Sequence, residues 1–62
     1  MKPGDLRRWT ITGGLILIVR IHGRDDGNGY CDYLENGKIY EWVPVLNIKV
    51  NSEVIDGKDE ER

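Results

Sequence analysis

The middle of this chain predicts a β-hairpin that turns at Asn36-Gly37, between two short runs with alternating side chains. Asn-Gly suits a two-residue type I′ turn, because both central residues of that turn need a positive φ. A two-residue turn also sets the register of the strands that it joins. Starting from Glu35 opposite Lys38, we expect these cross-strand pairs: Leu34 with Ile39, Tyr33 with Tyr40, Asp32 with Glu41, and Cys31 with Trp42.

This register divides the hairpin into two faces. One face has no charged side chain near its middle and is expected to line the core; it carries Cys31, Tyr33, Tyr40 and Trp42. On it, Cys31 is interpreted as a small buried side chain rather than a reactive thiol. The other face is expected to meet solvent, and its residues are the candidates for binding a partner: Tyr30, Asp32, Leu34, Ile39, Glu41 and Val43.

Extended segments are predicted on both sides of the hairpin. The continuous apolar run Leu15–Ile21 is rich in β-branched residues, which favours a central strand buried on much of both faces. Pro44 interrupts the second hairpin strand, because proline cannot donate to a ladder. The remaining predicted elements are a first strand at Leu6–Ile11, a single 3₁₀ turn at Val45–Asn47 and a last strand at Ile48–Val54.

Five short strands, with turn signals at each junction and no helical periodicity, predict an all-β fold and a small barrel. A chain of 62 residues is one domain, near the lower limit for a single core. We assign residues 1–55 to the barrel and residues 56–62 to a charged tail without an apolar anchor. Closure of the barrel would cover the apolar central strand at both edges.

The charges are unevenly placed along the chain. Residues 1–24 hold five Lys or Arg against Asp5 alone, whereas residues 25–62 hold ten acidic residues against four basic ones. Such polarity suits self-association or a partner of mixed charge. One cysteine cannot form an intrachain disulfide, and no segment has the length of a membrane span or the flanks of a signal peptide. We therefore expect a reducing, soluble compartment.

The order of these features resembles the SH3-like small barrels, in particular their KOW-type branch. Lys2–Leu6 looks like the Gly-Asp opening strand of that branch, and Asn36–Pro44 followed by Leu46–Val50 looks like its last hairpin, short turn and closing strand. The resemblance spans about residues 2–55, and Arg7 departs from it at a position that is usually apolar. Short chains of this pattern are similar to barrel proteins that tailed bacteriophages encode. The resemblance implies a location in the virion or the bacterial cytoplasm.

Two features of the solvent face suggest a partner. Leu34 and Ile39 form an apolar pair that could join Tyr30 and Val43 in one patch. Asp32 and Glu41 face each other, and like charges directly opposite are unfavourable. We expect Arg20 of the neighbouring strand to relieve them, with a cation of the partner as the alternative. The leading hypothesis is a non-catalytic protein-interaction module, a small virion-associated or accessory barrel that binds another protein or a second copy.

Other classes of function have weaker support. Nucleic-acid binding would use Arg7, Arg8, Arg20 and Arg24, but the acidic net charge disfavours it. No metal, cofactor or catalytic group is predicted, because His22 lacks a ligand at suitable spacing and reads as a surface residue. An inhibitor of a host enzyme remains an alternative. Type II dihydrofolate reductases, which are SH3-like barrels of similar length, are a remote one, since their Val-Gln-Ile-Tyr motif is absent.

Overall fold

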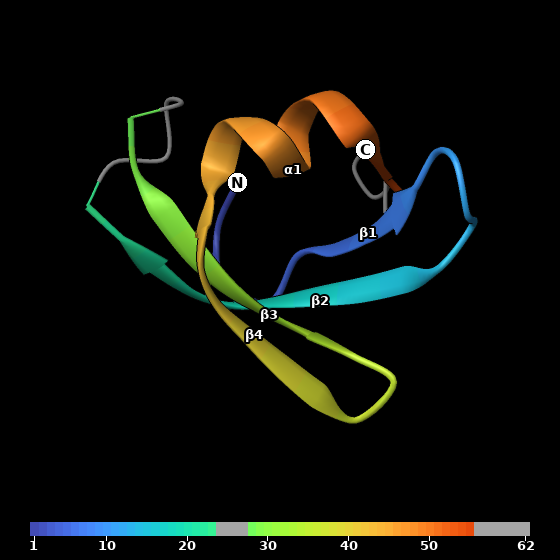
Figure 1. Ribbon diagram of the computed structural model, residues 1–62, viewed down its shortest axis with the longest axis horizontal. Coiled ribbons are helices and arrows are strands. Elements are labelled where there is room, and N and C mark those ends of the chain that lie inside the picture. Colours follow the sequence, from blue (N-terminus) through green and yellow to red (C-terminus); the bar gives the residue numbers. More distant parts are fainter. Residues whose placement is uncertain (24–27, 56–62) are drawn as a thin grey trace.

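The computed structural model describes residues 1–23 and 28–55. Its five strands form one antiparallel sheet in the order β4-β3-β2-β1-β5, so the described part is mostly β as predicted. One helix stands between the last two strands (Figure 1). The elements are β1 (Leu6–Trp9), β2 (Leu15–His22), β3 (Tyr30–Glu35), β4 (Lys38–Pro44), α1 (Val45–Asn51) and β5 (Ser52–Val54).

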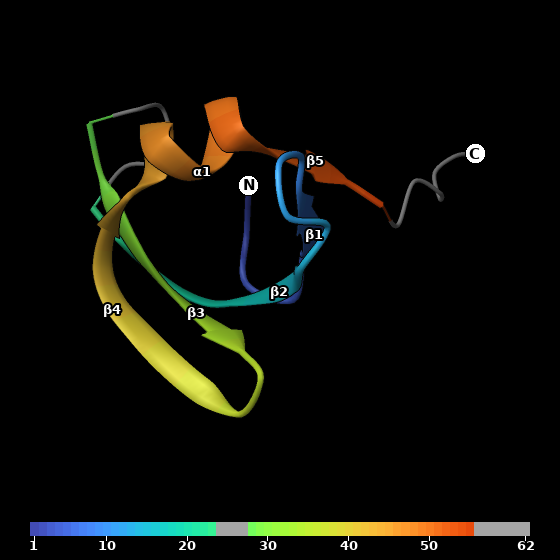
Figure 2. The same ribbon diagram turned by 45° about the vertical axis from the view of Figure 1, so that its right-hand side comes forward.

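The sheet is strongly curved, and α1 lies over its concave side (Figures 1 and 2). The space between them is the core, formed by the buried side chains of Ile16, Ile18, Cys31, Tyr33, Val45 and Ile48. The prediction of a buried Cys31 is confirmed, and burial raises the pKa of its thiol. The convex side of the sheet is therefore the outer face, and alternate residues of each strand point toward it.

β2 is the central strand of the sheet, as its apolar run predicted. The prediction that this strand is buried on much of both faces was wrong, because Ile16 and Ile18 are buried whereas Leu15 and Val19 are exposed. A β-bulge interrupts its pairing with β3 between Ile18 and Arg20. Bulges increase the local bend of a strand, which fits the curvature of the sheet at this point.

The hairpin turn is confirmed, since φ is 53° at Asn36 and 78° at Gly37. The first three predicted pairs are also confirmed, from Glu35–Lys38 to Tyr33–Tyr40. Beyond them β4 contains one extra residue, and Cys31 lies opposite Val43. The predicted pairs Asp32–Glu41 and Cys31–Trp42 are therefore wrong. The physical cause is a bulge at which Trp42 adopts a φ of 56°, a conformation that non-glycine residues rarely take.

The bulge also changes the two faces of the hairpin. Cys31 and Tyr33 lie in the core, and Tyr40 stacks on Tyr33 with ring centroids 5.0 Å apart while remaining partly exposed. Trp42 was predicted to line the core, but it is 60% exposed. An alternating pattern fails beyond a bulge, because the extra residue reverses the direction of every following side chain.

α1 replaces two predicted elements, the single 3₁₀ turn at Val45–Asn47 and most of the strand at Ile48–Val54. Val45 and Ile48 stand three positions apart, so a helix points both into the core, where both are fully buried. The Val45 N–H donates to the Gly29 carbonyl at 3.0 Å, which satisfies one of the free amides at the start of the helix. Packing overrides the β preference of this segment. β1 is also shorter than predicted and ends at Trp9.

Candidate functional site

An apolar row crosses the outer face of the sheet. Leu6 of β1 lies opposite Leu17 of β2, Leu17 lies opposite Leu34 of β3, and Leu34 lies opposite Ile39 of β4. Three of these side chains are half-buried by their neighbours, and Ile39 is 49% exposed. We call Leu6, Leu17, Leu34 and Ile39 the outer apolar row. Of the elements that the structure describes, none covers it, since α1 packs on the opposite face.

The partner-binding candidates from the sequence separate into two groups. Tyr30, Ile39 and Glu41 are exposed and Leu34 is half-buried, as expected for a solvent face. Two expectations were wrong. Val43 packs against the core, because the bulge turns it inward, and Asp32 is only 5% exposed.

Asp32 is a buried carboxylate, and three neighbouring residues stabilise its negative charge. Its Oδ1 accepts a hydrogen bond from the Trp42 backbone N–H at 3.0 Å and lies 2.8 Å from His22 Nε2. Arg20 stands opposite it in the β2–β3 register. The hydrogen bond from Trp42, with further help from His22 and from the charge of Arg20, holds the pKa of Asp32 below its usual value. The bulge thus replaces the expected repulsion from Glu41 with a hydrogen-bond donor.

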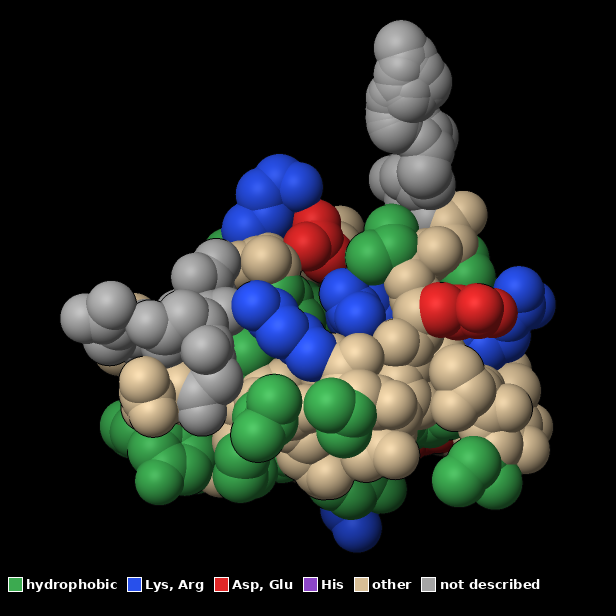
Figure 3. Space-filling model, turned by 90° about the horizontal axis from the view of Figure 1, so that it is seen from above, with side chains coloured by type: hydrophobic (Ala, Val, Ile, Leu, Met, Phe, Trp, Pro, Cys, Tyr) green, Lys and Arg blue, Asp and Glu red, His purple; other side chains and the backbone are tan. Residues whose placement is uncertain are grey.

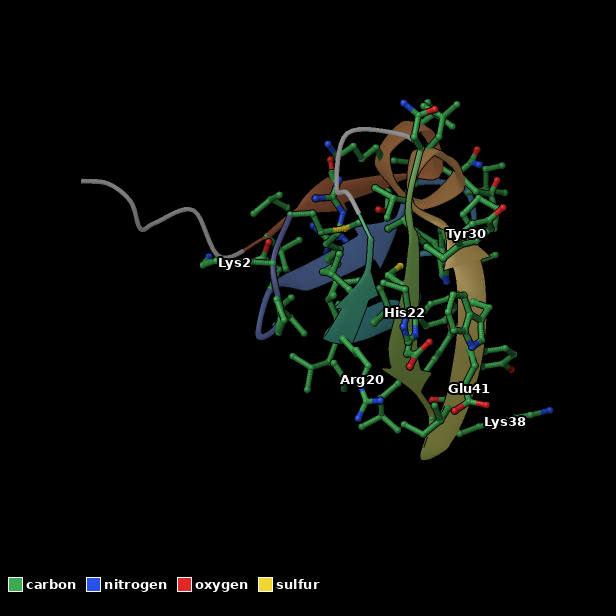
Figure 4. All side chains as sticks on the ribbon, turned by 90° about the vertical axis from the view of Figure 1, so that its left-hand side faces the viewer. Lys2, Arg20, His22, Tyr30, Lys38 and Glu41 are labelled. Atoms are coloured by element: carbon green, nitrogen blue, oxygen red, sulfur yellow. The ribbon has the colours of Figure 1, made fainter. Side chains whose placement is uncertain are left out.

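The side chain of Trp42 contacts the histidine that lies next to this carboxylate. Its indole ring stacks on the His22 ring, with centroids 3.7 Å apart and planes 10° apart. Tyr30 meets the same indole at an angle of 56°, with centroids 5.9 Å apart. We call Tyr30, Trp42 and His22 the Trp42 corner. Figure 4 looks onto it, with Tyr30 above and Glu41 below His22 in that view.

Sequence reasoning missed the Trp42 corner. His22 was interpreted as a surface residue, yet its side chain is only 16% exposed and lies within hydrogen-bond distance of the Asp32 carboxylate. Trp42 was assigned to the core because an unbroken alternation places it there. The one available signal was the unfavourable pairing of Asp32 with Glu41, which marks the point where a regular register is least stable.

The basic residues proposed for nucleic-acid binding do not share one exposed surface among the described residues. Arg7 is buried, and its guanidinium donates to Ser52 Oγ at 2.7 Å and to the Ser52 carbonyl at 3.2 Å. Arg8 lies 3.4 Å from Glu53, and Arg20 lies opposite Asp32. Arg24 falls outside the described residues. The three described arginines therefore do not form one basic surface along which a phosphate backbone could lie.

The helix side of the molecule also carries exposed apolar side chains, several of which lie close together (Figure 3). An open hollow of about 380 Å³ lies there, lined by Trp9, Ile11, Thr12 and Asn51. Trp9 itself packs edge-on against Tyr33 and donates to Glu35 at 3.3 Å, so it borders the core. Within residues 1–23 and 28–55, no three His, Cys, Asp or Glu side chains come together as a metal site requires. No helix in the same ranges is long and apolar enough to cross a membrane.

Comparison with protein-family models, with curated proteins and with solved structures finds no match for this chain. The grounds for a function are therefore its own geometry: the outer apolar row and the Trp42 corner beside it.

The state of Asp32 predicts how the fold responds to acid. Because the pKa of Asp32 is lower in the folded chain than its ordinary value of 3.8, its ionised form stabilises the fold above that value. This contribution is lost as the pH falls through the lower, folded pKa. We expect Asp32→Asn to remove it, so that stability depends less on pH below pH 4 than in the wild type.

Urea midpoints between pH 6 and pH 2 measure this effect. Glu53→Gln serves as the control and should keep the acid dependence of the wild type, because the ion pair of Glu53 with Arg8 is exposed and contributes little. Parallel curves for the wild type and Asp32→Asn would show that Asp32 has no such role.

Proposed function

We propose that this chain is a non-catalytic protein-interaction module, which binds a protein partner through the outer face of its sheet. The outer apolar row carries the proposal. Apolar side chains lined up across four strands are unfavourable in water unless another surface covers them. The partner expected here presents apolar side chains to the row and a basic side chain to the acidic end at Glu41.

The edge strand β4 is poorly suited to pairing with a strand of the partner, which favours binding through the face of the sheet. β4 is an edge strand of the described sheet, and such strands can pair with a further strand. Three features of β4 oppose that pairing: Lys38 at its start, the bulge at Trp42 and Pro44 at its end. A partner therefore gains more from the apolar face than from the edge.

We also propose that the sheet belongs to the SH3-like barrels. Three features support this: the meandering strand order, the bulge that bends β2, and the helical segment between β4 and β5. From the resemblance of the sequence to small barrels of tailed bacteriophages, we further propose that the protein acts in the virion or the bacterial cytoplasm. Mass spectrometry of purified virions tests that location.

A photo-crosslinking residue at Ile39 tests the proposed docking face in the cell. Leu46 of α1 is a matched control position, because it is an apolar residue of similar exposure (54%) on the opposite side. We expect a discrete crosslinked protein from position 39 and none, or a diffuse set, from position 46. The crosslinked protein should then bind the purified chain directly. Crosslinks of equal yield from both positions would contradict the proposal, and a crosslink to the chain itself would identify the partner as a second copy.

A further inference from the structure

We infer that the Trp42 corner is a binding site for an arginine side chain of a protein partner. The inference rests on the proposed function in taking the partner to be a protein, and it adds the side chain that anchors it. Three observations carry it: the indole is held in place, its ring is exposed, and the surrounding charge favours a cation.

The indole is held from two directions. The Asp32 carboxylate accepts a hydrogen bond from the backbone N–H of Trp42, which stabilises the φ of 56° at this residue. The His22 ring stacks on the indole ring itself. A non-glycine residue keeps such a φ only where its surroundings stabilise it, and such positions gather at functional sites. Because backbone and ring are already ordered, a ligand that stacks on Trp42 loses little affinity to ordering of the site.

The ring is also open to a ligand. Trp42 is 60% exposed although His22 stacks on its ring, and Tyr30 stands at an angle beside it. A guanidinium group is flat, weakly hydrated and attracted to the face of an indole, so an arginine can stack on Trp42 while its stem contacts Tyr30. The same hairpin already holds one cation over an aromatic ring, since Lys38 Nζ lies 5.2 Å from the centroid of Tyr40.

The charges near the corner favour a cation over a phosphate group. Glu41 directly precedes Trp42, is exposed and makes no salt bridge in the described part of the chain. Asp32, which accepts a hydrogen bond from the Trp42 backbone N–H, stays ionised at neutral pH, because that bond helps to lower its pKa. Arg20 lies opposite Asp32 in the register, so its charge faces that carboxylate. An incoming guanidinium can therefore stack on Trp42 and donate to the Glu41 carboxylate, whereas a nucleotide would bring its phosphate toward acidic side chains.

A titration followed by nuclear magnetic resonance tests this site directly. The probe is the peptide acetyl-Gly-Arg-Gly-amide, and the readout is the indole N–H signal of Trp42. Trp9 is the only other tryptophan, and its signal is the internal control. We expect the Arg peptide to shift the Trp42 signal with saturation while the Trp9 signal stays still. The matched peptide with citrulline, a neutral isostere, should bind at least about threefold more weakly, as should the peptide with leucine.

Two variants test whether arginine binding at the Trp42 corner is independent of partner binding at the outer apolar row. Glu41→Gln should weaken binding of the Arg peptide about two- to fivefold, since it removes one charge-assisted contact. Ile39→Asp should leave binding of the Arg peptide within twofold, while it lowers the affinity for the whole partner at least tenfold. Equal binding of the arginine and citrulline peptides would overturn the inference. So would a stronger response to adenosine monophosphate, which would assign the corner to nucleotides. Neither result would disturb the role of the outer apolar row.

Discussion

Ile48→Ala should lower the free energy of unfolding by about 3 kcal/mol, within the usual range of about 2 to 5 kcal/mol for truncating a fully buried isoleucine. Ile48 is fully buried where α1 closes the concave side of the sheet, and the alanine would leave a cavity among Ile16, Ile18 and Val45. Leu46→Ala on the same helix should cost less than about 0.5 kcal/mol, because Leu46 is exposed. Both changes alter helix propensity in the same direction, so the difference between the two losses of unfolding free energy measures the packing of Ile48.

Urea denaturation followed by circular dichroism measures this pair. A domain of this size has little stability to lose, so a milder change is needed beside Ile48→Ala. Ile48→Val provides the milder variant, with an expected cost of about 1 kcal/mol. If Leu46→Ala cost as much as the change at Ile48, the segment would not be a helix with this face in the core. The strand at Ile48–Val54 that the sequence pattern predicted would bury a different set of side chains.

Arg7→Ala should be the second large loss, at about 2 to 4 kcal/mol. The Arg7 side chain enters the protein from β1 and donates to Ser52 where α1 ends and β5 begins. Ser52 Oγ in turn donates to the Ile48 carbonyl of the helix. Truncation would remove the packing of the arginine stem together with both hydrogen bonds, and the junction between the helix and the last strand would lose its support.

Two matched variants divide this loss into its parts. Arg7→Met keeps most of the apolar stem and removes the buried charge, so we expect a cost of less than about 1.5 kcal/mol. Ser52→Ala keeps the arginine but removes one acceptor, and we expect about 1 to 3 kcal/mol. The midpoints of urea denaturation give all three values. Equal losses for the alanine and methionine variants of Arg7 would contradict a role for the packed stem.

The turn of the hairpin could be predicted from the sequence because Asn36-Gly37 carries its own conformational preference, and the neighbouring pairs follow by counting. The bulge could not be predicted in the same way. It depends on Asp32 accepting the Trp42 N–H and on His22 stacking over the indole, and both contacts join separate strands. The local sequence pattern therefore predicts the register only up to the point where contacts between strands make a different register more stable.

The segment from Val45 to Asn51 illustrates the same limit. Its valine and isoleucine residues favour a strand by local preference. In the structure, however, Val45 and Ile48 both fill the concave side of the sheet, and their three-residue spacing brings them to one side of a helix. For the candidate site, the apolar pair of Leu34 and Ile39 was predictable from the turn. Its extension to Leu17 and Leu6 was not, because it requires the register of two further strand pairs.

The most direct measurement of the docking face compares two substitutions in one binding assay. The purified partner identified by crosslinking would be titrated with the wild type, Ile39→Asp and Leu46→Asp, each first shown to be folded by circular dichroism. A charge at Ile39 would be buried against the partner, so we expect at least a tenfold loss of affinity, whereas Leu46→Asp on the opposite side should stay within twofold. Full affinity in Ile39→Asp, or a loss confined to Leu46→Asp, would contradict binding through the outer apolar row.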